Sequence, residues 1–142
     1  GIEQGFRNAI APADKVLIIT TPEVAAIRDA DRIIGLVEAE GKGPASLIIN
    51  RLKPEMVRAG NMMSTRDVVG ILAIDLIGIV PEDNDIIVFA NKGVPIVLDD
   101  KAASSLAFHN ITRRLMGEEV PFLDIREKPN LIERFVGFIR QG

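Results

Sequence analysis

The sequence predicts an α/β fold built on a doubly wound parallel sheet, with an amphipathic helix at its C-terminal end. Apolar runs short enough to be strands recur along the chain, and stretches with helical periodicity separate them. Strands that alternate with helices are typical of parallel sheets. Only three or four strands are visible, which is few for such a sheet, and the chain does not begin with Met. We therefore expect a partial sheet, from the C-terminal part of a longer protein.

The first strand is expected over residues 15–21, after a short helix over residues 3–9. Its apolar centre runs from Val16 to Ile19 without a polar residue. A continuous apolar run of this kind is typical of a strand that is buried on both faces of a parallel sheet.

A long helix is expected directly after this strand, over residues 23–40. Thr21 is a suitable N-cap, and Pro22 suits the first helical position. Glu23 would then lie at the positive end of the helix dipole. Five apolar residues recur at helical spacing along it: Val24, Ile27, Ala30, Ile34 and Val37.

The remaining elements alternate in the same way. Strands are expected over residues 46–50 and 76–80, with a short extended piece over 94–98. Helices are expected over 55–59, from Ser64 or Thr65 to about Leu72, over 85–90 and over 101–116. Residues 1–117 would then form the domain, the polar residues 118–128 a linker, and residues 129–142 the amphipathic helix.

Composition limits the classes of protein that fit. Hydrophobic residues make up 47% of the 142 residues, which is enough for one domain with a core. The formal net charge of -3 argues against a general nucleic-acid surface, which is usually basic. The chain has no Cys, which excludes disulfides and cysteine-ligated metal sites from it. No apolar run approaches the roughly 20 residues of a membrane-spanning helix.

Charged residues crowd the helix that leaves the first strand. In open α/β sheets, ligands bind beyond the carboxyl ends of the strands, where residues 20–23 are expected to lie. The helix that starts there carries Arg28, Asp29, Asp31 and Arg32, so this region is a candidate functional surface. The alternative is a solvated helix face with weak surface ion pairs.

The ends of the next two strands form a second candidate site. Asn50 and Arg51 end one of these strands, and Pro81, Glu82 and Asp83 end the other. An Asn side chain offers a donor and an acceptor together, which match the edge of an adenine base. The alternative is ordinary turn chemistry, since Asn and Pro are common turn residues.

The last residues form a third candidate site, which would bind a membrane surface. At about 100° per residue, the apolar side chains of this segment fall within an arc of roughly 160°. They are Leu131, Ile132, Phe135, Val136, Phe138 and Ile139. Arg134 and Arg140 lie on the opposite side, which suits a helix in a membrane interface. The alternative is a last helix docked on the domain. One short helix binds lipid weakly, so stable attachment would need two per assembly.

Several short motifs, taken together, resemble one known family. Gly1-Ile2-Glu3 matches the residues that follow the Walker B strand of that family. The other matching motifs are Thr21-Pro22-Glu23-Val24, Arg28-Asp29-Ala30-Asp31-Arg32, Asn50-Arg51, Ile77-Gly78-Ile79-Val80-Pro81-Glu82-Asp83, Asn91-Lys92-Gly93 and Leu115-Met116-Gly117-Glu118 with Pro121-Phe122. Over essentially all 142 residues, the chain resembles the septum-site branch of the MinD/ParA family of deviant-Walker P-loop ATPases.

The resemblance implies a fold of the P-loop NTPase type and an ATPase that uses ATP and Mg²⁺. It implies that Asn50 reads the adenine, that Arg51 flanks it, and that the loop Pro81-Glu82-Asp83 lines it. It also implies a surface that senses the nucleotide and contacts partners, formed by Glu3, Glu23, Arg28, Asp29 and Asp31. Residues 131–140 resemble the membrane-targeting helix of the family.

The resemblance further implies a role in placing the division septum. The complete protein would form an ATP-dependent homodimer, bind anionic membrane lipids, recruit the division inhibitor MinC and respond to MinE. No nucleic-acid partner is implied. The protein would be cytoplasmic and peripheral on the inner face of the cell membrane, or would lie in the chloroplast stroma if it is a plastid protein.

The phosphate-binding loop, the magnesium-binding Ser or Thr and the Walker B Asp of the family have no counterpart in this chain. We therefore expect no catalytic or metal-ligating residue in it, and no ATP hydrolysis by the chain alone. Three alternatives remain open. A flagellar-number regulator shares the amphipathic tail, and a ParA-type partitioning ATPase would need a basic surface for DNA. A non-enzymatic membrane adaptor is the alternative from a different class.

Overall fold

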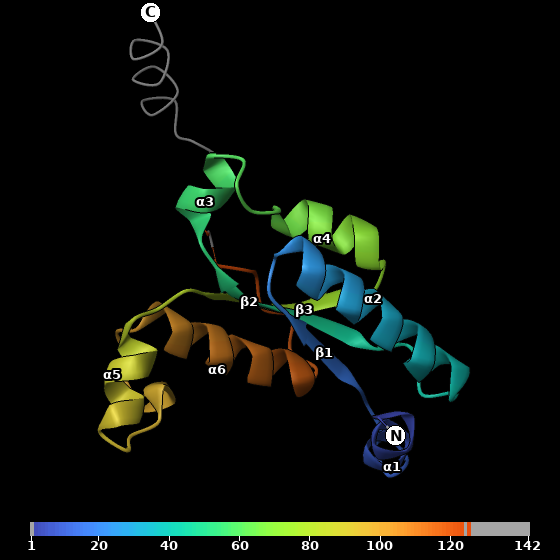
Figure 1. Ribbon diagram of the computed structural model, residues 1–142. Coiled ribbons are helices and arrows are strands. Elements are labelled where there is room, and N and C mark those ends of the chain that lie inside the picture. Colours follow the sequence, from blue (N-terminus) through green and yellow to red (C-terminus); the bar gives the residue numbers. More distant parts are fainter. Residues whose placement is uncertain (1, 124, 126–142) are drawn as a thin grey trace, which may run out of the picture.

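The computed structural model describes residues 2–123 and residue 125. Three parallel strands form its sheet in the order β1-β2-β3, with β1 (Leu17–Thr20), β2 (Ser46–Leu52) and β3 (Asp75–Pro81). The register pairs Leu17 with Ser46 and Leu47 with Leu76. The expected α/β class with a parallel sheet is thus confirmed (Figure 1).

Helices lie on both faces of this sheet (Figure 1). They are α1 (Ile2–Ile10), α2 (Val24–Ala39), α3 (Pro54–Arg58), α4 (Thr65–Leu72), α5 (Asp85–Asn91), the 3₁₀ helix η1 (Ile96–Leu98) and α6 (Ala103–Leu115). The α2 and α4 helices cover one face, and α6 covers the other. No helix within the described part of the chain is long and apolar enough to cross a bilayer.

Alternation along β2 divides the core into two layers. Leu47 and Ile49 are fully buried in the cluster under α2 and α4. Ile48 points the other way and packs with Val80 and Ile111 in the cluster under α6. Successive side chains of a strand alternate between faces, so an unbroken apolar run supplies both layers.

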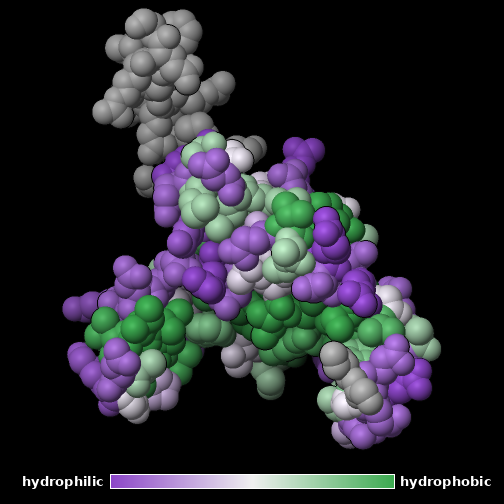
Figure 2. Space-filling model, viewed as in Figure 1, coloured by the Kyte–Doolittle hydropathy of each residue, from purple (hydrophilic) through white to green (hydrophobic). Residues whose placement is uncertain are grey.

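The expectation that β1 is buried on both faces is wrong in this structure. Ile18 and Thr20 are buried, but Leu17 is 37% exposed and Ile19 is 63% exposed. These two side chains are exposed because no described helix covers that face of β1. The α6 helix packs on β2 and β3, and β1 pairs only with β2 among the described strands. Hydrophobic side chains accordingly reach the surface in the middle of the molecule, where β1 runs (Figure 2).

The α2 helix begins later than the capping pattern predicts. Its N-cap is Glu23, and its first turn closes with a hydrogen bond from Ile27 N to Glu23 O of 2.9 Å. Pro22 is fully buried ahead of the helix, and the Thr21 hydroxyl donates to the Glu23 carboxylate instead of accepting from a backbone N–H. The predicted N-cap role of Thr21 is therefore wrong. In contrast, Ser64, one of the two predicted N-caps of α4, caps that helix by accepting from Asp67 N at 3.1 Å.

Residues 94–98 are not an extended piece, since Ile96–Leu98 forms the 3₁₀ helix η1. Beyond α6, Arg114 holds the following segment against β3. Its guanidinium donates to Ile77 O at 3.0 Å and to Val120 O at 2.9 Å. Leu123 then packs on the cluster under α6, and Ile125 packs on the cluster under α2 and α4. The expected linker therefore stays in contact with the domain as far as Ile125. The expected tail helix lies outside the described residues.

Candidate functional site

A β-bulge forms the centre of the second candidate site. Ile49 pairs with Ile79 and Leu52 pairs with Pro81, so Asn50 and Arg51 lie opposite one residue of β3. Arg51 adopts a left-handed backbone conformation, with φ of 58°. Bulges of this kind redirect side chains and are common beside functional sites. The strand does not end at Asn50 as predicted, and the bulge itself has no marker in the sequence.

An ion pair joins the ends of β2 and β3 at this bulge. Arg51 Nε donates to Glu82 Oε2 at 3.0 Å. The hydrogen bond and the charge of Glu82 raise the pKa of the Arg51 guanidinium above its ordinary value, and the charge of Glu23 adds to this. Both side chains of the pair are partly in solvent, so the pair contributes little to stability. Its main effect is to orient Arg51 across the two strand ends.

Asn50 is half-buried, and the described residues bind only the oxygen of its side-chain amide. Its Oδ1 accepts a hydrogen bond from Arg51 N at 3.0 Å. Its amide nitrogen donates to no group in the described part of the chain. The side chain can therefore still donate to a ligand, and its oxygen retains a second lone pair. This is the donor–acceptor pair that the edge of an adenine requires.

The carboxylate of Asp83 accepts hydrogen bonds from other residues of the protein. Its Oδ2 accepts from Ser104 Oγ at 2.6 Å and from Ser104 N at 3.2 Å, and its Oδ1 accepts from Asp85 N at 3.0 Å. The hydrogen bond from the Ser104 hydroxyl is the main cause that lowers the pKa of Asp83 below its ordinary value. Ser104 is fully buried, and sequence reasoning did not find it, because no local pattern connects positions 21 residues apart.

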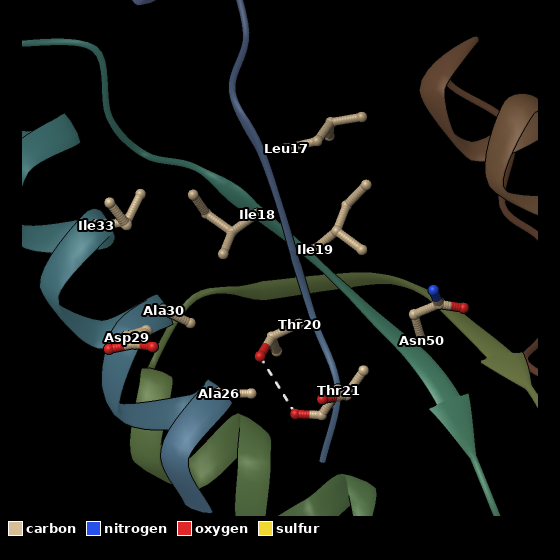
Figure 3. A pocket seen from close by; sticks show the side chains of 10 residues that line it. All are labelled: Leu17, Ile18, Ile19, Thr20, Thr21, Ala26, Asp29, Ala30, Ile33 and Asn50. Carbon is tan, nitrogen blue, oxygen red and sulfur yellow. Dashed lines mark hydrogen bonds between the residues drawn. The ribbon is translucent and has the colours of Figure 1, made fainter. Parts of the chain in front are cut away.

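A groove of about 510 Å³ runs beside β1 (Figure 3). Its walls come from β1 itself and from Ala26, Asp29, Ala30 and Ile33 of α2. Asn50 of β2 also lines it, and Figure 3 shows Asp29 and Asn50 on opposite sides of β1. The structure thus brings one predicted base-reading residue and one predicted sensing residue to the same groove.

The other predicted partner residues lie on or near α2. Glu23, Arg28 and Asp31 are exposed, and the last two line a second groove of about 310 Å³. Apolar side chains of α2 and α4 and of the segment before α4 form the rest of that groove: Val24, Ile27, Met63 and Ile71. Glu3 is exposed on α1 and lines neither groove.

Within residues 2–123 and 125, no three His, Cys, Asp or Glu side chains gather into a possible metal site. The predicted membrane-binding residues, from Leu131 to Arg140, lie outside the described part of the chain.

Comparison with known proteins identifies the family, although no protein-family model matches the chain. The septum site-determining protein MinD of Synechocystis sp. is 54% identical over 133 residues, which cover 93% of this chain and 50% of that protein. Among solved structures, the MinC:MinD cell division protein complex of Aquifex aeolicus contains a chain that is 52% identical, with a TM-score of 0.81. That match covers 85% of this chain and 50% of the other. By sequence, the chain belongs to the MinD family.

A more distant MinD, from Pyrococcus horikoshii and complexed with Mg-ADP, has a TM-score of 0.64 at 19% identity. This match covers 75% of this chain and 43% of the Pyrococcus chain. At such low identity, the likeness shows the fold alone. The predicted resemblance and the fold of the P-loop NTPase type are confirmed by these comparisons. The chain spans about half the length of the curated MinD relatives that it matches.

Proposed function

We infer that the chain supplies the base-binding edge and the membrane-binding tail of a MinD-type ATPase that places the division septum. The observation that carries this inference is the bulge at the end of β2. It sets Asn50, whose amide nitrogen donates to none of the described residues, beside the Arg51–Glu82 pair at the carboxyl ends of two parallel strands. This is the edge of an α/β sheet at which nucleotides bind.

The residues present fit a purine base. Asn50 can donate to and accept from the Watson–Crick or Hoogsteen edge of adenine, because one amide offers both functions. Arg51 can stack its planar guanidinium on the base, since Arg stacks well on aromatic faces. In this proposal, Pro81 and the backbone around Glu82 would line the other side of the base, since the Arg51–Glu82 pair and the pairing of Leu52 with Pro81 hold that loop beside the end of β2.

ATP and Mg²⁺ are the cofactors that we propose for the complete protein, and one relative is complexed with Mg-ADP. Phosphate binding and charge stabilisation are the substance of phosphoryl transfer, and they need donors and a metal close to the phosphates. The described residues offer no cluster that could ligate a metal. We therefore assign the phosphates and Mg²⁺ to residues outside this chain, and we expect no ATPase activity from the chain alone.

Partner binding is proposed for the surface of α2. A relative forms a MinC:MinD complex, which supports MinC as a partner. Arg28 and Asp31 are exposed beside an apolar groove, so a partner could combine apolar contact with paired charges there. ATP-dependent homodimerisation and a response to MinE complete this proposal.

Membrane attachment is proposed for residues 129–142, on the basis of their amphipathic pattern. A dimer would present two such helices, and the second would bind at high effective concentration. The protein would then lie on the inner face of the cell membrane, or in the chloroplast stroma if it is a plastid protein.

Liposome flotation of the full-length protein tests this function. Vesicles containing anionic lipid are mixed with the protein, with and without its last 14 residues, in ATP or in ADP. The proposal predicts flotation in ATP that is lost in ADP and lost without the tail. Binding to DNA, or flotation that does not depend on the tail, would contradict the septum-site assignment.

A further inference from the structure

The α6 helix starts without a capping side chain of its own. Its N-cap residue is Ala102, which has no hydrogen-bonding side chain. A helix N-terminus leaves backbone N–H groups without intrahelical partners, and a carboxylate is well suited to accept from them. Asp83 fills this role although it lies 21 residues away in the sequence, because its Oδ2 accepts from both the backbone N–H and the hydroxyl of Ser104.

The same carboxylate also fixes the loop that carries it. Its other oxygen accepts from Asp85 N at 3.0 Å, at the start of α5. One residue earlier, Glu82 N donates to Leu52 O at 2.9 Å, which ties the loop to the end of β2. The segment Pro81 to Asp85 is therefore held at three points, on α6, on α5 and on β2.

A continuous series of contacts connects this anchor to the base-reading side chain. Ser104 holds Asp83, and the neighbouring Glu82 accepts from Arg51 Nε at 3.0 Å. Arg51 N in turn donates to Asn50 Oδ1 at 3.0 Å and so sets the direction of the amide. A shift of the loop at Asp83 would move Glu82 and release the Arg51 guanidinium, which lies next to Asn50 in the bulge.

We propose that Asp83 and Ser104 are positioning residues for the nucleotide base. Asp83 acts on the ligand through Ser104 and the loop, and it does not read the base itself. This inference rests on the proposed function, since it requires that a base binds at Asn50. It assigns Ser104 a role in ligand specificity that the sequence pattern gives no reason to expect.

The chain offers a matched control in the adjacent residue. Ser105 is as deeply buried as Ser104, but its Oγ has no hydrogen-bond partner among the described residues. Ser104→Ala removes the hydroxyl that donates to Asp83, and Ser105→Ala removes a hydroxyl that bonds to none of the described residues. The two variants lose the same atom at neighbouring sites of one helix.

The test uses the full-length protein that carries this chain and three probes with Mg²⁺: ATP, GTP and tripolyphosphate. Ser104→Ala is expected to weaken ATP binding by up to about tenfold, because the loop beside the base loses one hydrogen bond to a charged group. It should reduce the preference for ATP over GTP and leave the affinity for tripolyphosphate unchanged, because that probe has no base. Ser105→Ala should bind all three as the wild type does.

If Ser104→Ala and Ser105→Ala bind ATP equally well, the positioning role is wrong. It is also wrong if Ser104→Ala weakens ATP and tripolyphosphate by the same factor, which would indicate a general loss of structure. A wild type that binds ATP no more tightly than tripolyphosphate would instead overturn the proposed base site itself. Should Ser104→Ala fail to fold, Asp83→Asn keeps the size of the side chain and is expected to show the same loss of base preference.

Discussion

Gly78 of β3 and Ile111 of α6 meet so closely that no side chain fits between them. A Cβ placed on Gly78 would lie 2.3 Å from Ile111 Cγ1 and 2.4 Å from Ile111 Cδ1. Ile111 is buried, and it is part of the cluster that joins α6 to β2 and β3. The contact fixes how near α6 approaches the sheet, and therefore where Ser104, on the same helix, meets Asp83.

Gly78→Ala is expected to destabilise the protein by about 1–3 kcal/mol, because it overpacks a closed site. Urea unfolding measures the change in the free energy of unfolding. The cost should shrink when Ile111→Ala is present, since that change removes the two clashing atoms. Gly35→Ala is the control, because its Cβ would meet nothing within 4 Å on the exposed side of α2. It should stabilise by about 0.5–1 kcal/mol, and equal losses for both variants would contradict the close approach.

Arg51 lies in the left-handed region, which any residue with a Cβ adopts at a cost. Arg51→Ala keeps that cost and loses the ion pair with Glu82, whereas Arg51→Gly loses the ion pair and relieves the backbone. The Gly variant should therefore be more stable than the Ala variant by about 1 kcal/mol. Thermal or urea unfolding checks the order, and an Ala variant that is the more stable of the two would argue against this backbone conformation.

Acid should weaken the contact between Asp83 and α6. The pKa of Asp83 is lowered in the folded state, mainly by the Ser104 hydroxyl, so folding favours the ionised form. The stabilisation is complete above the unfolded pKa of about 3.9 and is lost as the pH falls through the lower folded pKa. Asp83→Asn should be less stable than wild type at pH 7, with a smaller loss of stability on acidification below about pH 4. The free energy of unfolding of both proteins is measured from pH 7 to pH 3. Parallel curves of this free energy against pH would show that Asp83 makes no such contribution.

Phe135→Glu places a charge in the apolar arc of the C-terminal segment. We expect it to abolish flotation with anionic vesicles in the presence of ATP, because a charge cannot enter the acyl region without cost. Phe135→Leu keeps the arc apolar and should still float. ATP hydrolysis in solution by the full-length protein should change little for either variant. Flotation of Phe135→Glu at the wild-type level would mean that this segment is not the membrane contact.

Much of the fold follows from patterns that are local in the sequence. The alternation of apolar runs with helical segments predicts the positions of the three strands, and Ser64 with Asp67 marks the start of α4. These features depend on residues within a few positions of one another. The comparisons then confirm the family that the motifs resemble.

The predictions that are wrong concern features of the fold that depend on contacts between distant parts of the chain. The exposure of Ile19 depends on which strands and helices cover β1, and the sequence of β1 does not state this. The late start of α2 coincides with the burial of Pro22, and the bulge at Asn50 depends on its register with β3. The role of Asp83 depends on Ser104, which approaches it only in the folded chain. In each case, tertiary contacts overrode local preference.

The most direct test of the account is the affinity of the full-length protein for ATP after Asn50→Ala. The variant removes the amide that we assign to the base, and Asn61→Ala, at an exposed position in the turn between α3 and α4, is the control. Equilibrium binding of ATP should weaken about tenfold or more for Asn50→Ala, with tripolyphosphate binding and the control unchanged. An affinity for ATP equal to that of the wild type would contradict a base site at the end of β2.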